Sequence, residues 1–159
     1  MYLRASAFKD MDMDSSLIES QLNHLNPDTP AQFGIMTPQH MVEHLTVTMK
    51  LSSGRIKLPE FEPNEKQLMQ KQALIYTDME FPRGVQAPNS KGELTELRFP
   101  DLDTAKEKLV QSIQEYEEVF EKKPDFKSIH PRFGYLTHEE WEKFHQKHFS
   151  HHFRQFGIA

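Results

Sequence analysis

The chain has 159 residues, a formal net charge of −5 with neutral histidines, and no cysteine. The lack of cysteine excludes disulfides, thiolate zinc sites and a cysteine nucleophile. The acidic balance argues against nucleic-acid binding, which requires a basic face, and no apolar run approaches the ~18 residues that cross a membrane. The first ten residues also lack the apolar core of a signal peptide. We therefore predict one cytoplasmic domain over residues 1–159, without nucleic-acid or membrane partners.

The first predicted helix covers about residues 15–26. Asp14 is a candidate N-cap, because its carboxylate can accept hydrogen bonds from the first turn. Apolar residues then recur at helical spacing, namely Leu17, Ile18, Leu22 and Leu25. A loop with two prolines follows over residues 26–30.

The second predicted helix has the clearest start in the sequence. Thr37 suits an N-cap, Pro38 suits the first helical position, and the helix is expected to end near Leu51. One face of this helix carries Met41, His44, Leu45, Thr48 and Met49. His44 therefore lies inside a mostly apolar face, whereas His40 falls nearer its edge.

Residues 52–100 form the least regular part of the sequence. A short helix is predicted over residues 65–75, with Asn64 as its N-cap. Residues 81–92 are rich in turn-forming residues. A long irregular segment in a small domain is either functional or packs across the core as a cover, and both possibilities stay open for this one.

The next strong helix is predicted over residues 102–120, with Asp101 as its N-cap. Its apolar stripe consists of Leu102, Ala105, Leu109, Ile113, Tyr116 and Phe120. The stripe contains no histidine, which favours a plain core-forming role. A tight connection over residues 130–137 then leads into the last helix, for which Thr137 is the candidate N-cap.

The last predicted helix runs toward Gly157, a natural C-terminal stop. Four of the nine histidines lie within residues 145–152. His148 and His152 are four residues apart, so their imidazoles share one helical face and can share a metal ion. The same pair can instead be buried packing residues with hydrogen-bond partners. Gln155 lies on the same stripe and is either a partner of a ligand histidine or a polar residue at the helix end.

Four amphipathic helices without convincing strands predict an all-α fold. We expect a four-helix bundle with a long irregular segment between the second and third main helices. Bundles of this kind often build metal sites in the core from side chains on facing helices.

A third metal ligand should come from a helix other than the last one. His44 is the best candidate, because it is the only histidine on the inner face of a different strong helix. His145 competes, but three ligands on one straight helix span about 10 Å of rise, too far for one ion, and Glu43 points away from the face of His44. Three neutral imidazoles suit catalytic zinc and also nickel or iron. We therefore predict that His44, His148 and His152 bind a divalent metal.

Several of these stretches resemble a known family. They read TPQHMVEHL over residues 37–45, HPRFGYLT over residues 130–137, and KHFSHHFRQFG over residues 147–157, together with Trp141. The chain resembles the DinB/YfiT-like superfamily, and most closely its DUF1569 branch of small uncharacterised bacterial proteins, over about residues 30–159.

The resemblance implies a four-helix bundle and a divalent metal held by one histidine of the second helix and an H-x3-H pair of the last. By position these are His44, His148 and His152. It also implies a metal-dependent enzyme that acts with low-molecular-weight thiols, such as a thiol S-transferase or maleylpyruvate isomerase. Residues 52–100 match no motif of the thiol-using members, which leaves the substrate class open.

Two functions follow from these patterns. The first is a metal-dependent transferase or hydrolase that acts on a small molecule through a metal-bound thiolate or water. For that chemistry the sequence offers Glu43, Tyr135 and His145 only as nearby possibilities for a general base. The second is a non-catalytic helical bundle, whose exposed loop or face mediates dimerisation or partner binding.

Overall fold

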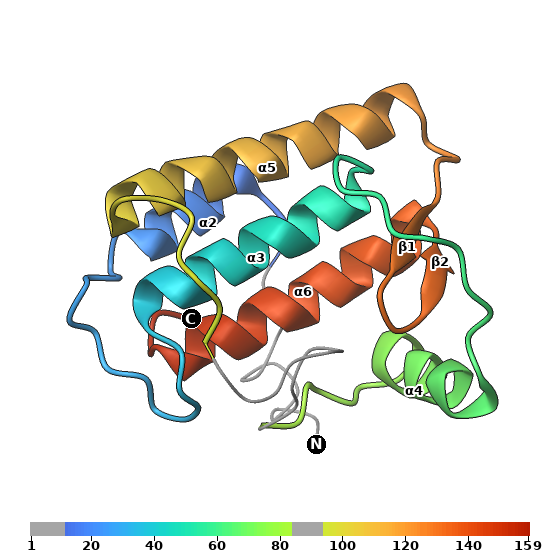
Figure 1. Ribbon diagram of the computed structural model, residues 1–159, viewed down its shortest axis with the longest axis horizontal. Helices are drawn as coiled ribbons and strands as arrows, with labels where there is room; N and C mark the ends of the chain where they lie inside the picture. Colours follow the sequence, from blue (N-terminus) through green and yellow to red (C-terminus); the bar gives the residue numbers. More distant parts are fainter. Residues whose placement is uncertain (1–11, 84–93) are drawn as a thin grey trace, which may run out of the picture.

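The structure, a computed structural model, describes residues 12–83 and 94–159. Within these ranges the chain is mostly helical, with five helices and one small two-stranded sheet (Figure 1). None of the helices in this part combines the length and the apolar composition that a membrane crossing demands. The expectations for the first ten residues, and for most of the turn-rich segment 81–92, concern residues outside the described ranges.

Each helix begins directly after a residue that the sequence predicts as its N-cap. The side chains of these residues accept hydrogen bonds from backbone N–H groups of the first turn: Asp14, Thr37, Asn64, Asp101 and Thr137. The helices that follow are α2 (Ser15–Leu22), α3 (Pro38–Ser52), α4 (Glu65–Tyr76), α5 (Leu102–Lys122) and α6 (His138–Gln155). The predicted helix starts are therefore confirmed, because each cap satisfies N–H groups that have no partner within the helix.

The first helix is shorter than predicted. It ends at Leu22, where the sequence suggested an end near residue 26. The backbone N–H of Leu25 donates to the carbonyl of Leu22 at 2.9 Å, so the chain turns more tightly than an α-helix there. Leu25 is nevertheless buried. Its spacing reflects packing into the core and not a continuation of the helix.

The two-stranded sheet is a departure from the all-α prediction. β1 (Ser128–His130) pairs with β2 (Gly134–Leu136) in an antiparallel register that sets His130 opposite Gly134. Nδ1 of His130 closes the turn by accepting hydrogen bonds from the backbone N–H groups of Arg132 (3.0 Å) and Phe133 (3.3 Å). Strands of three residues are too short to give an alternating pattern, so the sequence did not reveal them.

The long helices pack around a shared apolar core. Figure 1 shows α3 between α5 and α6, with α2 packed against α5. All members of the apolar stripe predicted for α5 are buried: Leu102, Ala105, Leu109, Ile113, Tyr116 and Phe120. Because α3 contacts α6, the mostly apolar face of α3 that carries His44 is brought to the histidine-rich helix.

A buried lysine fastens α4 and the residues after it to α6. Nζ of Lys147 donates to the backbone carbonyls of Leu74, Thr77 and Met79, at 2.6 Å for the last two. These carbonyls lie at the end of α4 and just beyond it, where helical hydrogen bonding stops. The anchor holds the segment that continues to Phe81 against the last helix.

Candidate metal centre

Three histidines from two helices meet at the contact between α3 and α6. His44 Nε2 lies 3.0 Å from His148 Nε2, and one ligand nitrogen from each of His44, His148 and His152 lies within 4.8 Å of the others. The ring centroids are 4.9 Å apart for His44 and His148, 5.0 Å for His44 and His152, and 4.8 Å for His148 and His152. In the described part of the chain, this is the one group of histidines or acidic residues close enough to hold a metal ion.

A glutamine amide sets the tautomer of one ring. Gln155 Nε2 donates to the backbone carbonyl of Phe33 at 2.9 Å, which turns Gln155 Oε1 toward His152 Nδ1 at 2.8 Å. An amide oxygen only accepts hydrogen bonds, so His152 carries its proton on Nδ1. The lone pair of its Nε2 is then available to a cation, an arrangement typical of metal-binding histidines.

Burial keeps the three imidazoles neutral. It lowers the pKa of His44 from 6.5 to about 4, with a smaller contribution from His151. Burial also lowers the pKa of His152 to about 3, with His44 adding to the effect. The pKa of His148 is lowered well below its ordinary value, first by burial and then by the neighbouring rings. Neutral imidazole is the form that binds metal ions, so the donor set fits a divalent cation.

The segment that carries the three histidines matches a known family. The family model described as "Protein of unknown function (DUF1569)" matches residues 38–158, which include all three histidines. The chain belongs to the DUF1569 family. No curated protein and no solved structure matches this chain.

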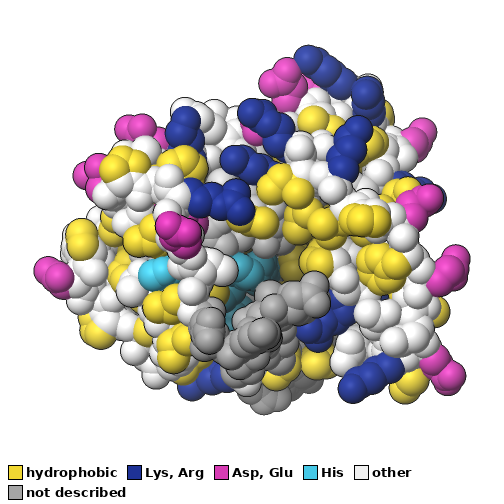
Figure 2. All heavy atoms as spheres, viewed as in Figure 1, with side chains coloured by type: hydrophobic (Ala, Val, Ile, Leu, Met, Phe, Trp, Pro, Cys, Tyr) yellow, Lys and Arg dark blue, Asp and Glu magenta, His cyan; other side chains and the backbone are white. Residues whose placement is uncertain are grey.

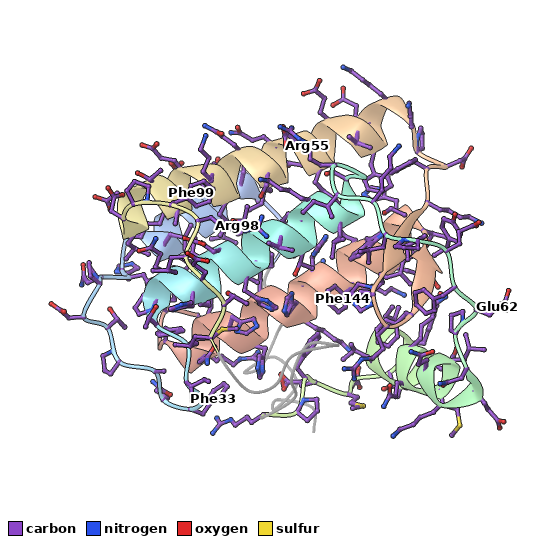
Figure 3. The ribbon with its side chains drawn as sticks, in the orientation of Figure 1. Phe33, Arg55, Glu62, Arg98, Phe99 and Phe144 are labelled. Carbon is purple, nitrogen blue, oxygen red and sulfur yellow. The ribbon has the colours of Figure 1, made fainter. Side chains whose placement is uncertain are left out.

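Aromatic rings cover the triad of this DUF1569 protein. Phe81 stacks on His148 with ring centroids 5.1 Å apart and planes at 21°, and Phe144 contacts the same ring at 5.1 Å. Phe33 packs on His151 at 5.2 Å, and Figure 3 shows Phe33 and Phe144 coming from different segments. Figure 2 shows histidine side chains in a hollow of this face, next to hydrophobic side chains. Phe81 could not be identified from the sequence, because it lies in the irregular segment.

Two of the nearby residues considered as general bases have partners outside the triad. His145, which was also the competing ligand, is fully buried, and its Nε2 lies 2.9 Å from Ser52 Oγ. Tyr135 is exposed on the small sheet and donates to Glu60 at 2.8 Å. Neither residue belongs to the group that could hold a metal ion.

Glu43, the third such residue, anchors the segment that precedes α5. Its carboxylate accepts hydrogen bonds from the backbone N–H groups of Arg98 at 2.7 Å and Phe99 at 3.2 Å. His40 reaches the same segment through Nε2, 3.0 Å from the carbonyl of Thr95. Figure 3 shows Arg98 and Phe99 lying beside α3. Glu43 is thus engaged by backbone groups and is not a member of the group that could hold a metal ion, as the sequence suggested.

Proposed function

We propose that His44, His148 and His152 hold one divalent cation, zinc, nickel or iron, and that this DUF1569 protein is a metal-dependent transferase or hydrolase of a small molecule. The observation that carries the proposal is the convergence of three neutral imidazoles, with ligand nitrogens within 4.8 Å of one another. Two helices far apart in the sequence supply these rings. Histidine nitrogens suit all three of the metals named.

The chemistry would be divided between the cation and the chain. A divalent cation supplies Lewis-acid chemistry, which polarises an oxygen or sulfur atom of a reactant and lowers its pKa. Gln155 orients His152, and Phe81 and Phe144 shield His148 from water. Such shielding strengthens electrostatic interactions at the site, because the local dielectric constant falls. His44 is only partly buried, which would give a reactant access to the group.

The proposal extends to the fold and its setting. We propose that α2, α3, α5 and α6 form a DinB-like four-helix bundle within one cytoplasmic domain over residues 1–159. The packing of α3 against both α5 and α6, and of α2 against α5, supports this. The DinB-like relationship would place the thiol-dependent enzymes among the activities to test first.

The metal is tested by elemental analysis of protein purified without a histidine tag. We expect about one divalent ion per chain in the wild type and a loss of that ion in His148→Ala. His151→Ala is the matched control, because His151 neighbours the triad on α6 but lies outside the metal-binding group. Equal metal content in both variants, or none in the wild type after incubation with zinc, nickel and iron, would contradict the proposed site.

The reaction is tested on the metal-loaded protein with low-molecular-weight thiols. A bacillithiol-type and a glutathione-type donor, each with electrophilic acceptors, probe transferase activity, and ester or amide substrates probe hydrolysis. Activity that disappears in His148→Ala and persists in His151→Ala would support an enzyme. If the metal-loaded wild type turns over neither the transferase nor the hydrolase substrates, the proposed enzyme activity is contradicted and only the proposed metal binding remains.

A second candidate is a non-catalytic bundle that forms a homodimer or binds a protein partner. It is favoured by the exposed apolar side chains of α4, where Leu68 is 49% and Met69 is 66% exposed. Sedimentation equilibrium of the wild type and of Met69→Glu tests this alternative. A dimer that Met69→Glu dissociates supports it, whereas a monomer at all concentrations removes the homodimer.

A further inference from the structure

Three buried side-chain nitrogens in the described part of the chain have no hydrogen-bond partner: Trp141 Nε1, His145 Nδ1 and His148 Nδ1. All three residues belong to α6, and their spacing places them on one face over successive turns. A buried polar atom without a partner is costly, and such atoms in folded proteins usually have a specific explanation. The explanation here begins with the proton positions on the two histidines.

The surroundings of His145 fix its tautomer. Ser52 Oγ donates its proton to the carbonyl of Met49 at 2.7 Å, so the same oxygen accepts from His145 Nε2 at 2.9 Å. His145 therefore carries its proton on Nε2, and its Nδ1 is left with a lone pair. This buried nitrogen is an acceptor in need of a donor.

His148 has the opposite requirement. Its Nε2 faces His44 Nε2 at 3.0 Å, on the side of the triad. If Nε2 presents its lone pair to a cation, the proton of the ring lies on Nδ1. That buried nitrogen is then a donor in need of an acceptor. His145 and His148 are three residues apart on α6, which places them as neighbours on the helix surface.

We propose that His145 is the positioning residue for His148, and that one internal water links His148 Nδ1–H to the lone pair of His145 Nδ1. The inference rests on the proposed metal site. A water fits this link, because it can accept from His148 Nδ1–H and donate to His145 Nδ1, and the two nitrogens make no direct hydrogen bond. The chain of contacts then runs from the triad through His148 and His145 to Ser52, and ends at the carbonyl of Met49. It holds His148 in the tautomer that a ligand requires.

The indole N–H of Trp141 is a second candidate donor to His145 Nδ1. Its indole Nε1–H is also without a partner, and its ring stacks on His145 with centroids 5.2 Å apart. If His145 Nδ1 served Trp141 instead, removal of His145 would change the indole N–H and leave His148 unaffected. The two N–H groups therefore need to be observed separately.

The test compares zinc affinities of untagged variants by chelator competition. His145→Phe keeps a ring in the cavity but offers no acceptor, and His145→Asn keeps an acceptor oxygen near the position of Nδ1. We expect zinc to bind 10- to 100-fold more weakly to His145→Phe, as is typical when the partner of a ligand histidine is lost, and His145→Asn to recover most of the loss. His24→Phe is the control, because His24 is an exposed histidine that lies outside α6.

A second measurement uses only the wild type and His145→Phe. With ¹⁵N-labelled histidine and tryptophan, which report the two N–H groups separately, we expect His148 Nδ1–H to exchange slowly with solvent in the zinc-loaded wild type and faster in His145→Phe. Equal zinc affinity of the wild type, His145→Phe and His145→Asn would overturn this inference but not the metal site. The same holds if His145→Phe changes the exchange of the Trp141 indole N–H and leaves that of His148 Nδ1–H unchanged. A wild type that binds no zinc would overturn the metal site itself, and this inference with it. If His145→Phe does not fold, fast exchange of His148 Nδ1–H in the wild type would still overturn it.

Discussion

Gln155 Oε1 lies 2.8 Å from His152 Nδ1, and the amide of the same glutamine is fixed by the carbonyl of Phe33. This pair of contacts couples the orientation of one triad ring to the segment that precedes α3. Gln155→Leu removes the acceptor while keeping a side chain of similar volume. We expect zinc affinity to fall about 10- to 100-fold, since such partners fix the tautomer of a ligand histidine. Chelator competition measures the change, and Gln114→Leu on the exposed face of α5 is the control. Unchanged affinity in Gln155→Leu would show that His152 needs no such partner.

The backbone of Gly34 lies against the side chain of Gln155, so a substitution at Gly34 should disturb the same contact. Its φ is +78°, and a Cβ at this position would lie 2.8 Å from Gln155 Nε2. Gly34→Ala should therefore destabilise the protein by roughly 1–3 kcal/mol and also weaken zinc binding. Gly54→Ala is the matched control, because Gly54 has a φ of +80° and a Cβ there would lie 2.7 Å from the ring of Phe126, away from Gln155. Denaturant unfolding should detect a loss in both variants, whereas zinc affinity should fall only in Gly34→Ala. An equal effect of both substitutions on affinity would argue against this coupling.

Stability should fall as the pH is lowered through the ordinary range of histidine. Burial lowers the pKa of His130 to about 3, with His145 and Arg132 adding to the effect, and burial lowers the pKa of His145 to about 3 as well. Below about pH 6.5 the unfolded chain binds protons that these folded histidines do not, so the free energy of unfolding decreases by up to about 1.4 kcal/mol per pH unit for each. Urea unfolding at several pH values from about 7 down to about 5 measures how steeply the free energy of unfolding depends on pH.

His130→Asn isolates one contribution to that slope. An asparagine oxygen can still accept from the backbone N–H groups that His130 Nδ1 binds, but it does not titrate. The variant should lose part of the pH dependence while keeping much of the stability at pH 7. His24→Asn replaces an exposed histidine and should leave the slope unchanged. An identical slope in His130→Asn and the wild type would refute this assignment.

Metal binding should be much less sensitive to mild acid than binding to exposed histidines. The pKa of His44 is lowered to about 4 and that of His152 to about 3, chiefly by burial. Protons therefore do not compete for these nitrogens near neutral pH, and binding should release almost none from them. Calorimetry in buffers of different ionisation enthalpy measures the protons released on zinc binding at pH 6.5. Because a zinc-bound water can itself lose one proton, release of two or more protons would indicate that the apo rings are charged.

The local part of this architecture could be predicted from the sequence, whereas contacts between distant segments could not. Thr37 and Pro38 mark the start of α3, and helical spacing puts His148 and His152 on one face, because both signals depend on neighbours in the chain. The structure brings His44 to that pair, as the pattern on α3 suggested, while the role of the three as ligands stays a prediction. Phe81 reaches His148 only because α4 and its continuation are fastened to α6, which no local pattern reveals.

The lysine that makes this attachment gives the last prediction. Lys147 is buried, and its ammonium group donates to the carbonyls of Leu74, Thr77 and Met79. Lys147→Met keeps the aliphatic volume but leaves those carbonyls without their donor. Hydrogen bonds to charged groups contribute about 1.5–3 kcal/mol, so we expect a loss of stability of that order.

The loss should be local as well as global. Hydrogen exchange should accelerate over residues 65–79, because the end of α4 loses its hydrogen bonds with the Lys147 ammonium group of α6. Lys108→Met is the control, since Lys108 is an exposed lysine on α5. If exchange over α4 is as slow in Lys147→Met as in Lys108→Met, the attachment does not depend on this ammonium group. If it accelerates, Phe81 should also loosen from His148, which makes Lys147 a distant determinant of how well the triad is shielded.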